Sequence, residues 1–281
     1  MIAMEDHVTG GDDCADSGQA AVIVACGGTG NRFKGELGNP KQAGVPQLPE
    51  KQFVLLAGKP VLAHTLDVLE KHNGVRFVVL VLPDHLMDQG EALVQGQWQG
   101  VHGEICSEPH TRYTKVKAIL VGGKDRQASV ANGLTALAAL GWQGPVLVQD
   151  GVRPCTPSRV YDQVIEGVHR YGNAVAAIPI RDTIKRADGD GIVRETIDRR
   201  DLWQIQTPQG FWMADLQEAY DKGCQQGLQV TDDAALMEAL GKCVHLVEGD
   251  PVNMKLTYPG DLDVLEAVLY AQARKLAVSR V

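Results

Sequence analysis

The first apolar run of the chain leads into a glycine-rich turn that carries an arginine. Residues 25–33 read Ala-Cys-Gly-Gly-Thr-Gly-Asn-Arg-Phe. Glycines let backbone N–H groups approach an anion closely, and the Arg32 guanidinium offers a forked pair of donors that matches phosphate. The turn therefore predicts a nucleotide site, whereas a plain tight turn would leave Arg32 unexplained. It is not a dinucleotide fingerprint, because Phe33 stands where a glycine is required, and no Gly-Lys-Ser/Thr closes it as a P-loop.

A lysine that could neutralise phosphates occurs twice in similar surroundings. Lys51 opens a Lys-Gln-Phe segment shortly before a Gly-Lys-Pro turn, and Lys41 opens a Lys-Gln pair after a proline. We favour Lys51, because the strand and helix predicted after it fix its place at the sheet. The role of residues 34–50 stays open. Our hypothesis is that 40–50 form a flap over a triphosphate, and separate alanine substitutions of the two lysines would discriminate between them.

Alternating strands and helices must position these motifs. Apolar runs rich in Val and Ile predict buried strands at 20–25, 75–82, 116–121, 145–149 and 174–180. Helical patterns follow Pro60, cover 126–140, resume after Pro157, and recur at 213–226, 231–240 and from about 259–261. The alternation predicts an α/β fold with a mostly parallel, Rossmann-like sheet and helices on both faces. In such folds the ligand lies beyond the carboxyl ends of the strands.

One of these helices has a start signal of its own. Thr231 is predicted to cap the helix at 231–240, with Asp232 and Asp233 in its first turn. A hydroxyl at the cap satisfies an unpaired backbone N–H group, and acidic side chains in the first turn complement the helix dipole. From the sequence, Asp232 and Asp233 are therefore expected only to stabilise the start of this helix.

Residues 180–203 interrupt the alternation. Two strand-like stretches flank Asp188-Gly189-Asp190-Gly191, which is a hairpin signal, and their arginines and lysines are too polar for a core. The segment therefore predicts a β-hairpin arm that projects from the body. We expect a homodimer formed through this arm, because an isolated hairpin is only marginally stable and usually packs on a partner. The Asp-Gly-Asp sequence is interpreted as turn chemistry and not as a metal-binding DxD motif.

The net charge of -8 is unevenly distributed along the 281 residues. Five acidic residues lie within 1–31, which contain no Lys or Arg, so the remainder is close to neutral. We interpret 1–18 as a disordered acidic tail, because it is polar and rich in glycine, and 19–281 as a single domain. The charge argues against a nucleic-acid-binding protein but permits a basic pocket for phosphates.

Other signals are absent from the sequence. The cysteines contain no CxxC pair and the histidines no HxxxH pair, so reduced thiols are expected and a zinc site is not. No run approaches the roughly 20 apolar residues of a membrane span, and the first residues do not resemble a secretory signal. We expect a cytoplasmic protein without membrane association.

The ordered set of motifs is similar to one family. The glycine-rich turn, Lys-Gln-Phe and Gly-Lys-Pro are typical of sugar-phosphate nucleotidyltransferases, and further matching segments lie at 122–130, 149–154, 181–185, 196–199, 206–209 and 253–257. The chain resembles the 2-C-methyl-D-erythritol 4-phosphate cytidylyltransferases over about residues 20 to 270. Each motif alone is weak, but the ordered set is specific.

The resemblance implies a reaction. Members transfer CMP from CTP to 2-C-methyl-D-erythritol 4-phosphate, in the non-mevalonate isoprenoid route, by in-line attack at the α-phosphorus with release of pyrophosphate. Mg²⁺ bridges the phosphates, and no covalent enzyme intermediate is expected. Such a displacement requires cations in fixed positions around phosphorus. By the same resemblance, the catalytic cations are Arg32, Lys51 and Lys255.

The resemblance also implies how the substrates are bound. The methylerythritol phosphate would contact Arg153, together with Thr183 and Arg199 from the arm of the neighbouring subunit. Asp150 is the candidate metal ligand, although a lone Asp at a strand end serves as often as a hydrogen-bond acceptor or helix cap. The implied nucleotide-binding residues are Ala25, Cys26, Gly27, Gly28, Gly123, Ser129, Asp150 and Gly151.

The chain departs from the family pattern at several positions. Residues 25–27 are Ala-Cys-Gly where Pro-Ala-Ala is usual, residues 151–152 are Gly-Val where Ala-Ala is usual, and Val252 stands where an Asp is frequent. The change at Val252 weakens the implied metal binding. The link between Arg32 and Lys51 is also longer than in the family.

Two alternatives remain. A ribitol-phosphate cytidylyltransferase has closely similar loops, but Thr-Ile-Asp-Arg at 196–199 and the arm sequence at 181–185 favour methylerythritol phosphate. A nucleotide-binding regulatory protein without catalysis is the alternative from another class. The joint presence of Arg32, Lys51, Lys255 and Arg199 argues against it, because binding CTP alone does not require all four.

Overall fold

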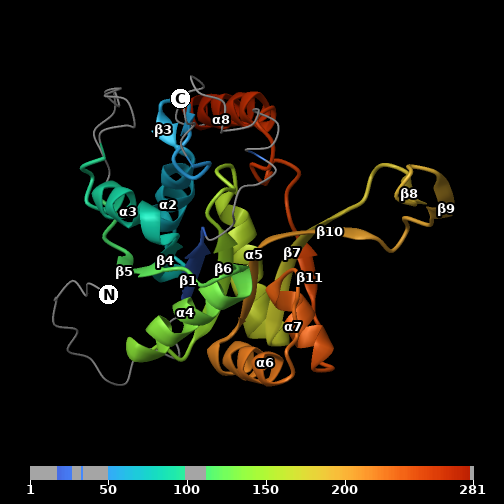
Figure 1. Cartoon of the computed structure of the whole chain (residues 1–281). Helices are drawn as coiled ribbons and strands as arrows, with labels where there is room; N and C mark the ends of the chain where they lie inside the picture. The colour runs from blue at the N-terminus through green and yellow to red at the C-terminus, as the bar shows by residue number, and fades with distance from the viewer. Residues whose placement is uncertain (1–17, 27–32, 34–49, 99–111, 279–281) are drawn as a thin grey trace, which may run out of the picture.

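The computed structural model describes residues 18–26, 33, 50–98 and 112–278 (Figure 1). Within them, a seven-stranded sheet has the order β11-β7-β10-β6-β1-β4-β5. Most neighbours are parallel, but β10 is antiparallel to both β6 and β7. The predicted α/β class with a mostly parallel sheet is confirmed. The strands of this sheet are β1 (Ala20–Ala25), β4 (Val75–Leu82), β5 (Val116–Val121), β6 (Pro145–Asp150), β7 (Asn173–Pro179), β10 (Trp203–Trp212) and β11 (Leu246–Glu248).

Helices cover both faces of the sheet. One face packs against α2 (Val61–Lys71) and α5 (Ser158–Tyr171), and the other against α4 (Arg126–Ala139), α6 (Met213–Gln225) and α7 (Asp233–Ala239). The short strands β2 (Leu55–Leu56) and β3 (Lys59–Pro60) pair just before α2. Also described are η1 (Asp84–Leu86), α3 (Met87–Val94) and α8 (Asp261–Val278). No helix in the described part of the chain is long and apolar enough to cross a membrane.

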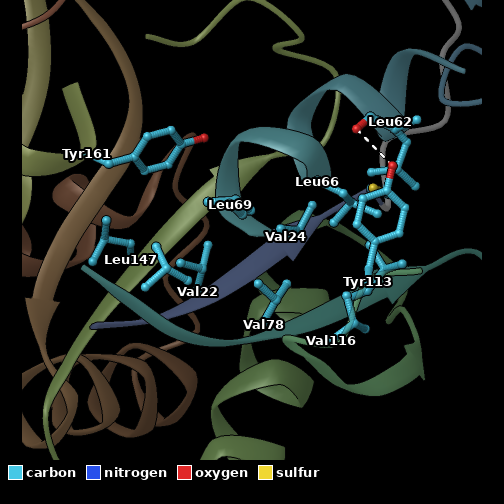
Figure 2. Close-up of a cluster of buried hydrophobic side chains, with 14 of the residues drawn as sticks. Val22, Val24, Leu62, Leu66, Leu69, Val78, Tyr113, Val116, Leu147 and Tyr161 are labelled. Carbon is cyan, nitrogen blue, oxygen red and sulfur yellow. Dashed lines mark hydrogen bonds between the residues drawn. The ribbon is translucent and has the colours of Figure 1, made fainter. Parts of the chain in front are cut away.

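The residues of β1 divide between two apolar cores. Val22 and Val24 pack with Leu62 and Leu66 of α2 (Figure 2), whereas Ile23 belongs to the core on the opposite face. Successive side chains of a strand point to opposite faces, so a strand covered on both sides is apolar throughout. All of β1 is buried, which is why its sequence reads as an uninterrupted apolar run.

The arm is a two-stranded antiparallel hairpin of β8 (Ile184–Ala187) and β9 (Val193–Ile197). Figure 1 shows it projecting from the body of the molecule. At its tip the Asp188 carboxylate accepts hydrogen bonds from the backbone N–H groups of Asp190 and Ile192. The Asp-Gly-Asp sequence therefore shapes the turn, as expected. The role of the arm in dimerisation stays a prediction.

Two local features differ from the sequence-based expectations. The ten-residue strand β10 was not expected, because Pro208 interrupts its apolar pattern; the register with β7 shifts between Ile205 and Gln209. The prediction that Thr231 caps α7 is wrong. The Asp232 carboxylate accepts from the Ala235 N–H at 3.1 Å and is the cap, since a charged acceptor suits the positive end of a helix.

Candidate active site

The carboxyl ends of β1, β5 and β6 lie along one edge of the sheet, where ligands of parallel sheets bind. Ala25 stands opposite Asp150 in the register of β1 and β6, and the Gly151 N–H donates to the Ala25 carbonyl at 3.1 Å. Beyond β5, the Gly122 N–H donates to the Leu82 carbonyl at 2.7 Å. The sheet thus brings residues 25–26, 122–123 and 150–151 to a common edge.

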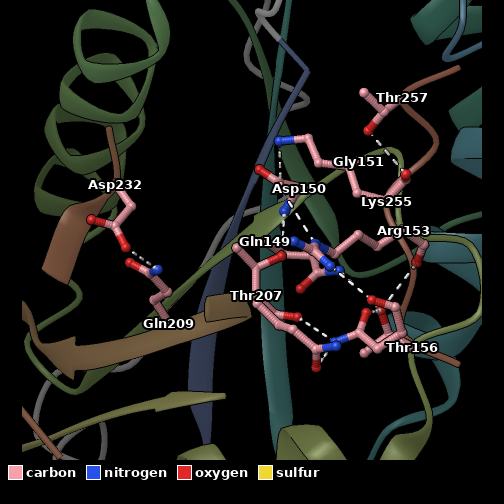
Figure 3. Close-up of polar contacts among 12 residues, drawn as sticks. Gln149, Asp150, Gly151, Arg153, Thr156, Thr207, Gln209, Asp232, Lys255 and Thr257 are labelled. Atoms are coloured by element: carbon pink, nitrogen blue, oxygen red, sulfur yellow. Dashed lines mark hydrogen bonds and ion pairs between the residues drawn. The ribbon is translucent and has the colours of Figure 1, made fainter. Parts of the chain in front are cut away.

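Three cations surround the Asp150 carboxylate. Lys255 Nζ lies 2.9 Å and Arg153 Nε 3.3 Å from its Oδ2 (Figure 3), and Arg126 Nε lies 3.7 Å from its Oδ1. Burial works to raise the pKa of Asp150, but Lys255, then Arg153 and Arg126, outweigh it and hold that pKa well below its usual range. Three positive charges around one carboxylate leave a net positive field that attracts a further anion.

Buried hydrogen bonds fix the loop that carries Lys255. The Arg153 side chain is 9% exposed, and its Nη1 donates to the Asn253 carbonyl at 2.7 Å. The Asn253 carboxamide donates to the Thr207 carbonyl at 2.8 Å, and the Thr207 hydroxyl accepts from the Asp150 N–H at 3.1 Å. These contacts join β6, β10 and the 253–255 loop. Arg153 thus organises the cluster, and its contact with a substrate phosphate stays a prediction.

The Lys-Gln-Phe segment lies beside the end of β1. The positive charge of Lys51 acts to lower the pKa of Cys26, the residue that follows β1. Gln52 is fully buried and its Nε2 donates to the Cys26 carbonyl at 2.5 Å, while Phe53 is buried in the core with α2. The neighbours of Lys51 therefore anchor it at this edge. Its catalytic role stays a prediction, and Lys41 and residues 40–49 of the proposed 40–50 flap lie outside the described residues.

The turn between β5 and α4 is tightly organised. The Gly123 N–H donates to the Ser129 hydroxyl at 3.1 Å, and that hydroxyl donates to the Asp125 carbonyl at 2.8 Å. The Asp125 carboxylate caps α4 by accepting from the Ala128 N–H at 2.7 Å. A Cβ at Gly123 would lie 2.4 Å from the Cβ of Ala128, so this close turn requires glycine. Whether it binds cytosine stays a prediction.

Other predicted site residues lie elsewhere. Thr183 and Arg199 are on the exposed arm, where the Arg199 guanidinium donates to the Arg181 carbonyl. Because the arm projects from the body (Figure 1), none of their described contacts joins them to Asp150. Of the predicted site residues in the glycine-rich turn, Gly27, Gly28 and Arg32 lie outside the described part of the chain.

Cys26 is not prepared for nucleophilic attack. Burial, aided by the charge of Asp150, raises the pKa of its thiol to about 12. The thiol is therefore protonated at neutral pH, whereas the reactive form of cysteine is the thiolate. Cys26 instead packs in the apolar core with α2.

We expect Cys26 to resist iodoacetamide in the folded protein near about pH 8, while the exposed Cys224 is alkylated readily. Peptide mass spectrometry measures both thiols in one sample. Unfolding in urea is the control, because it exposes both side chains and should make their rates similar. Equal rates in the folded protein would contradict the buried, protonated state of Cys26.

Two residues of the cluster were not anticipated as site residues. Asp233 was interpreted as part of a helix start, and Arg126 as a helix start within the family-like segment 122–130. Arg126 Nη2 donates to Asp233 Oδ2 at 2.7 Å, and its Nε faces Asp150. The available signal was an arginine within a few residues of the Gly122-Gly123 pair at a strand end. Its pairing with residue 233 has no local signal, because it depends on how α4 and α7 pack.

The described residues hold no group of three or more His, Cys, Asp or Glu side chains that could bind a metal ion. Asp150 offers a single carboxylate. Asp250, in the loop with Val252, is engaged by Arg159 Nη2 at 2.6 Å and by the Val252 N–H at 2.9 Å. One carboxylate fits a magnesium ion that arrives with phosphate oxygens, because Mg²⁺ is commonly held in this way. It does not fit an ion held by the protein alone.

A mostly parallel α/β sheet with a cationic cluster at its strand ends defines a class of proteins that bind phosphorylated ligands at this edge. The sequence narrows the class further. The profile of the 2-C-methyl-D-erythritol 4-phosphate cytidylyltransferase family matches residues 20–271, and the chain belongs to that family.

Individual relatives agree over nearly their whole length. The chain is 36% identical to the 2-C-methyl-D-erythritol 4-phosphate cytidylyltransferase of Syntrophus aciditrophicus (strain SB), covering 89% of this chain and 96% of that protein. It is also 36% identical to that of Halalkalibacterium halodurans, covering 91% and 99%. The crystal structure of the Thermus thermophilus protein of this name is similar with a TM-score of 0.64 at 29% identity, covering 89% and 98%.

Proposed function

We propose that this enzyme transfers the cytidylyl group of CTP to 2-C-methyl-D-erythritol 4-phosphate and releases pyrophosphate. The observation that carries the proposal is the cluster of Lys255, Arg153 and Arg126 around Asp150, at the strand ends of a chain that belongs to the family. Joining two anionic substrates requires such a concentration of positive charge.

We assign different tasks to the cations of the cluster. The Lys255 side chain is 37% exposed, against 9% for Arg153, so its ammonium has the better access to a phosphate. When Lys255 turns from Asp150 to the α-phosphate, Arg153 and Arg126 keep the carboxylate ionised. Lys255 and Lys51, together with Arg32, then stabilise the negative charge that develops around phosphorus during in-line attack.

The remaining predicted contacts complete the substrate site. Asp150 is the residue that would hold Mg²⁺ together with the triphosphate, and the ion would neutralise phosphate charge. Backbone groups near Cys26 and Gly123, with the Ser129 hydroxyl, are assigned to cytosine. The acceptor phosphate is assigned to Arg153 and to the arm of a second subunit.

The test follows pyrophosphate release by the full-length protein with Mg²⁺, methylerythritol phosphate and each nucleoside triphosphate in turn. We expect release with CTP and little with the others, and none when Mg²⁺ is removed. Absence of release with CTP and methylerythritol phosphate would overturn the proposal. Release with ribitol phosphate in its place would favour the alternative acceptor.

Mixing two inactive variants tests the homodimer and its shared site. If Arg199 acts on the neighbouring subunit, R199A and K255M chains that exchange subunits form dimers with one intact site, and about a quarter of all sites regain activity. Pyrophosphate release before and after mixing measures this, with each variant alone as the control. No recovery, despite subunit exchange shown by native mass spectrometry, would contradict an arm that acts between subunits.

A further inference from the structure

A buried carboxylate lies behind the cationic cluster. Asp233, the first residue of α7, is completely buried. Arg126 Nη2 donates to its Oδ2 at 2.7 Å, and the Tyr220 hydroxyl donates to its Oδ1 at 2.5 Å. A buried ionised carboxylate requires such partners, because it has lost its water. Asp233 therefore links α7 to α4 and α6.

Arg126 connects the Asp233 carboxylate with the Asp150 carboxylate at the strand ends. Its Nη2 faces Asp233, while its Nε lies 3.7 Å from Asp150 Oδ1. Burial works to lower the pKa of Arg126, but Asp233 and Asp150 outweigh it and raise that pKa. The guanidinium thus stays charged, and its planar fork spans two carboxylates as a single-headed ammonium cannot.

The strand β10 holds the start of α7 in place. Gln209 Oε1 accepts from the N–H groups of Asp233 and Ala234, each at 3.1 Å, and its Nε2 donates to Asp232 at 2.8 Å (Figure 3). Gln209 pairs with Val148 of β6, the strand that ends at Asp150. The position of Asp233 is thus fixed relative to that strand.

We propose that Asp233 is a positioning residue for the active site, which holds the Arg126 guanidinium beside Asp150. With Arg126 in place, Asp150 keeps its orientation when Lys255 leaves it for the substrate phosphates. Asp233 itself, being completely buried, does not touch a substrate. Helix capping does not explain it, because Asp232 caps α7. The inference rests on the proposed function, since it names a residue that acts through others on that site.

The first test compares Asp233→Asn with Asp221→Asn, the same change at an exposed position of α6. Asparagine at 233 keeps the shape but removes the charge that holds Arg126, and we expect kcat/KM to fall about 10- to 100-fold, as for other supporting residues. The exposed Asp221 side chain lies outside the hydrogen-bonded network of Asp233, Arg126 and Gln209, so asparagine at 221 should leave kcat/KM unchanged. Thermal unfolding shows whether both variants are folded. Equal activity of folded D233N and the wild-type enzyme would overturn the proposal.

The second test asks whether Asp233 acts through Arg126. In R126K the ammonium can pair with Asp233, so the fold is retained, but it cannot span both carboxylates. We expect R126K to unfold near the wild-type temperature and to lose about tenfold in kcat/KM. Wild-type activity in R126K would overturn the proposal, and this holds even if D233N fails to fold.

The double variant R126M/D233N separates positioning from a general structural role. If Asp233 acts only through Arg126, kcat/KM of the double variant equals that of R126M alone. Losses that multiply would overturn the proposal. An inactive wild-type enzyme would instead refute the proposed function, so the two failures are distinguishable.

Discussion

Replacing Lys255 with methionine is expected to lower kcat about 10²- to 10³-fold, the loss typical of removing one group that stabilises developing charge. Lys255 Nζ lies 2.9 Å from Asp150 Oδ2, and it is the most exposed of the three cations in the cluster. Methionine keeps the apolar part of the side chain and removes the ammonium. The KM for CTP should rise less than kcat falls, because the charge matters most at the transition state.

Pyrophosphate release at saturating CTP and methylerythritol phosphate measures this loss. Lys242→Met is the matched control, because Lys242 pairs with Asp215 and Glu218 on α6, away from the strand ends. It should retain kcat. The fold should survive in K255M, since Asp150 keeps Arg153 and Arg126 as partners. A K255M enzyme with nearly wild-type kcat would remove Lys255 from the catalytic cations.

Gly151→Ala should strongly destabilise the protein unless Cys26 is changed as well. A Cβ at position 151 would lie 2.3 Å from Cys26 Sγ and 3.2 Å from methyl groups of Leu62 and Val24. The Cys26 thiol cannot move aside easily, because it is buried in the core with α2. Overpacking of a filled core typically costs about 1 to 3 kcal/mol. Activity should fall too, since Asp150 precedes the strained residue.

The double variant C26A/G151A should recover most of the lost stability. It exchanges a large and a small residue for two of intermediate size, which is the combination of alanines usual in the family at these positions. Urea unfolding of the wild type, both single variants and the double variant gives the coupling energy between the sites. Additive effects would show that the sulfur is not what excludes a Cβ at residue 151.

Local patterns were sufficient to predict most of the strands and helices. β1 is an apolar run because it is covered on both faces, and Gly172 ends α5 in the left-handed conformation that glycine favours. Such signals lie within a few neighbouring residues, so they can be recognised from the sequence alone. The strand β10 shows the limit, because its proline hides the pattern and only pairing with β6 and β7 makes it a strand.

In the candidate site, too, the sequence identifies individual residues, whereas their contacts depend on tertiary packing. Lys255, Arg153 and Asp150 are recognisable as chemistry-bearing residues at strand ends or in family motifs, and a phosphate site could be predicted from them. That Asp150 is surrounded by three cations depends on the packing of α4 and of the 253–255 loop.

Asp233 shows most clearly why part of the site could not be predicted from the sequence. Its sequence context predicts only an acid in the first turn of a helix, because the local pattern indicates the helix dipole and not what packs against the side chain. Its burial beneath Arg126 arises because β10 holds α7 against the sheet, which brings two residues far apart in the chain within 2.7 Å. The sequence therefore shows which charged residues are present and which helices and strands carry them. Only the packing of those elements decides which charged residues form ion pairs.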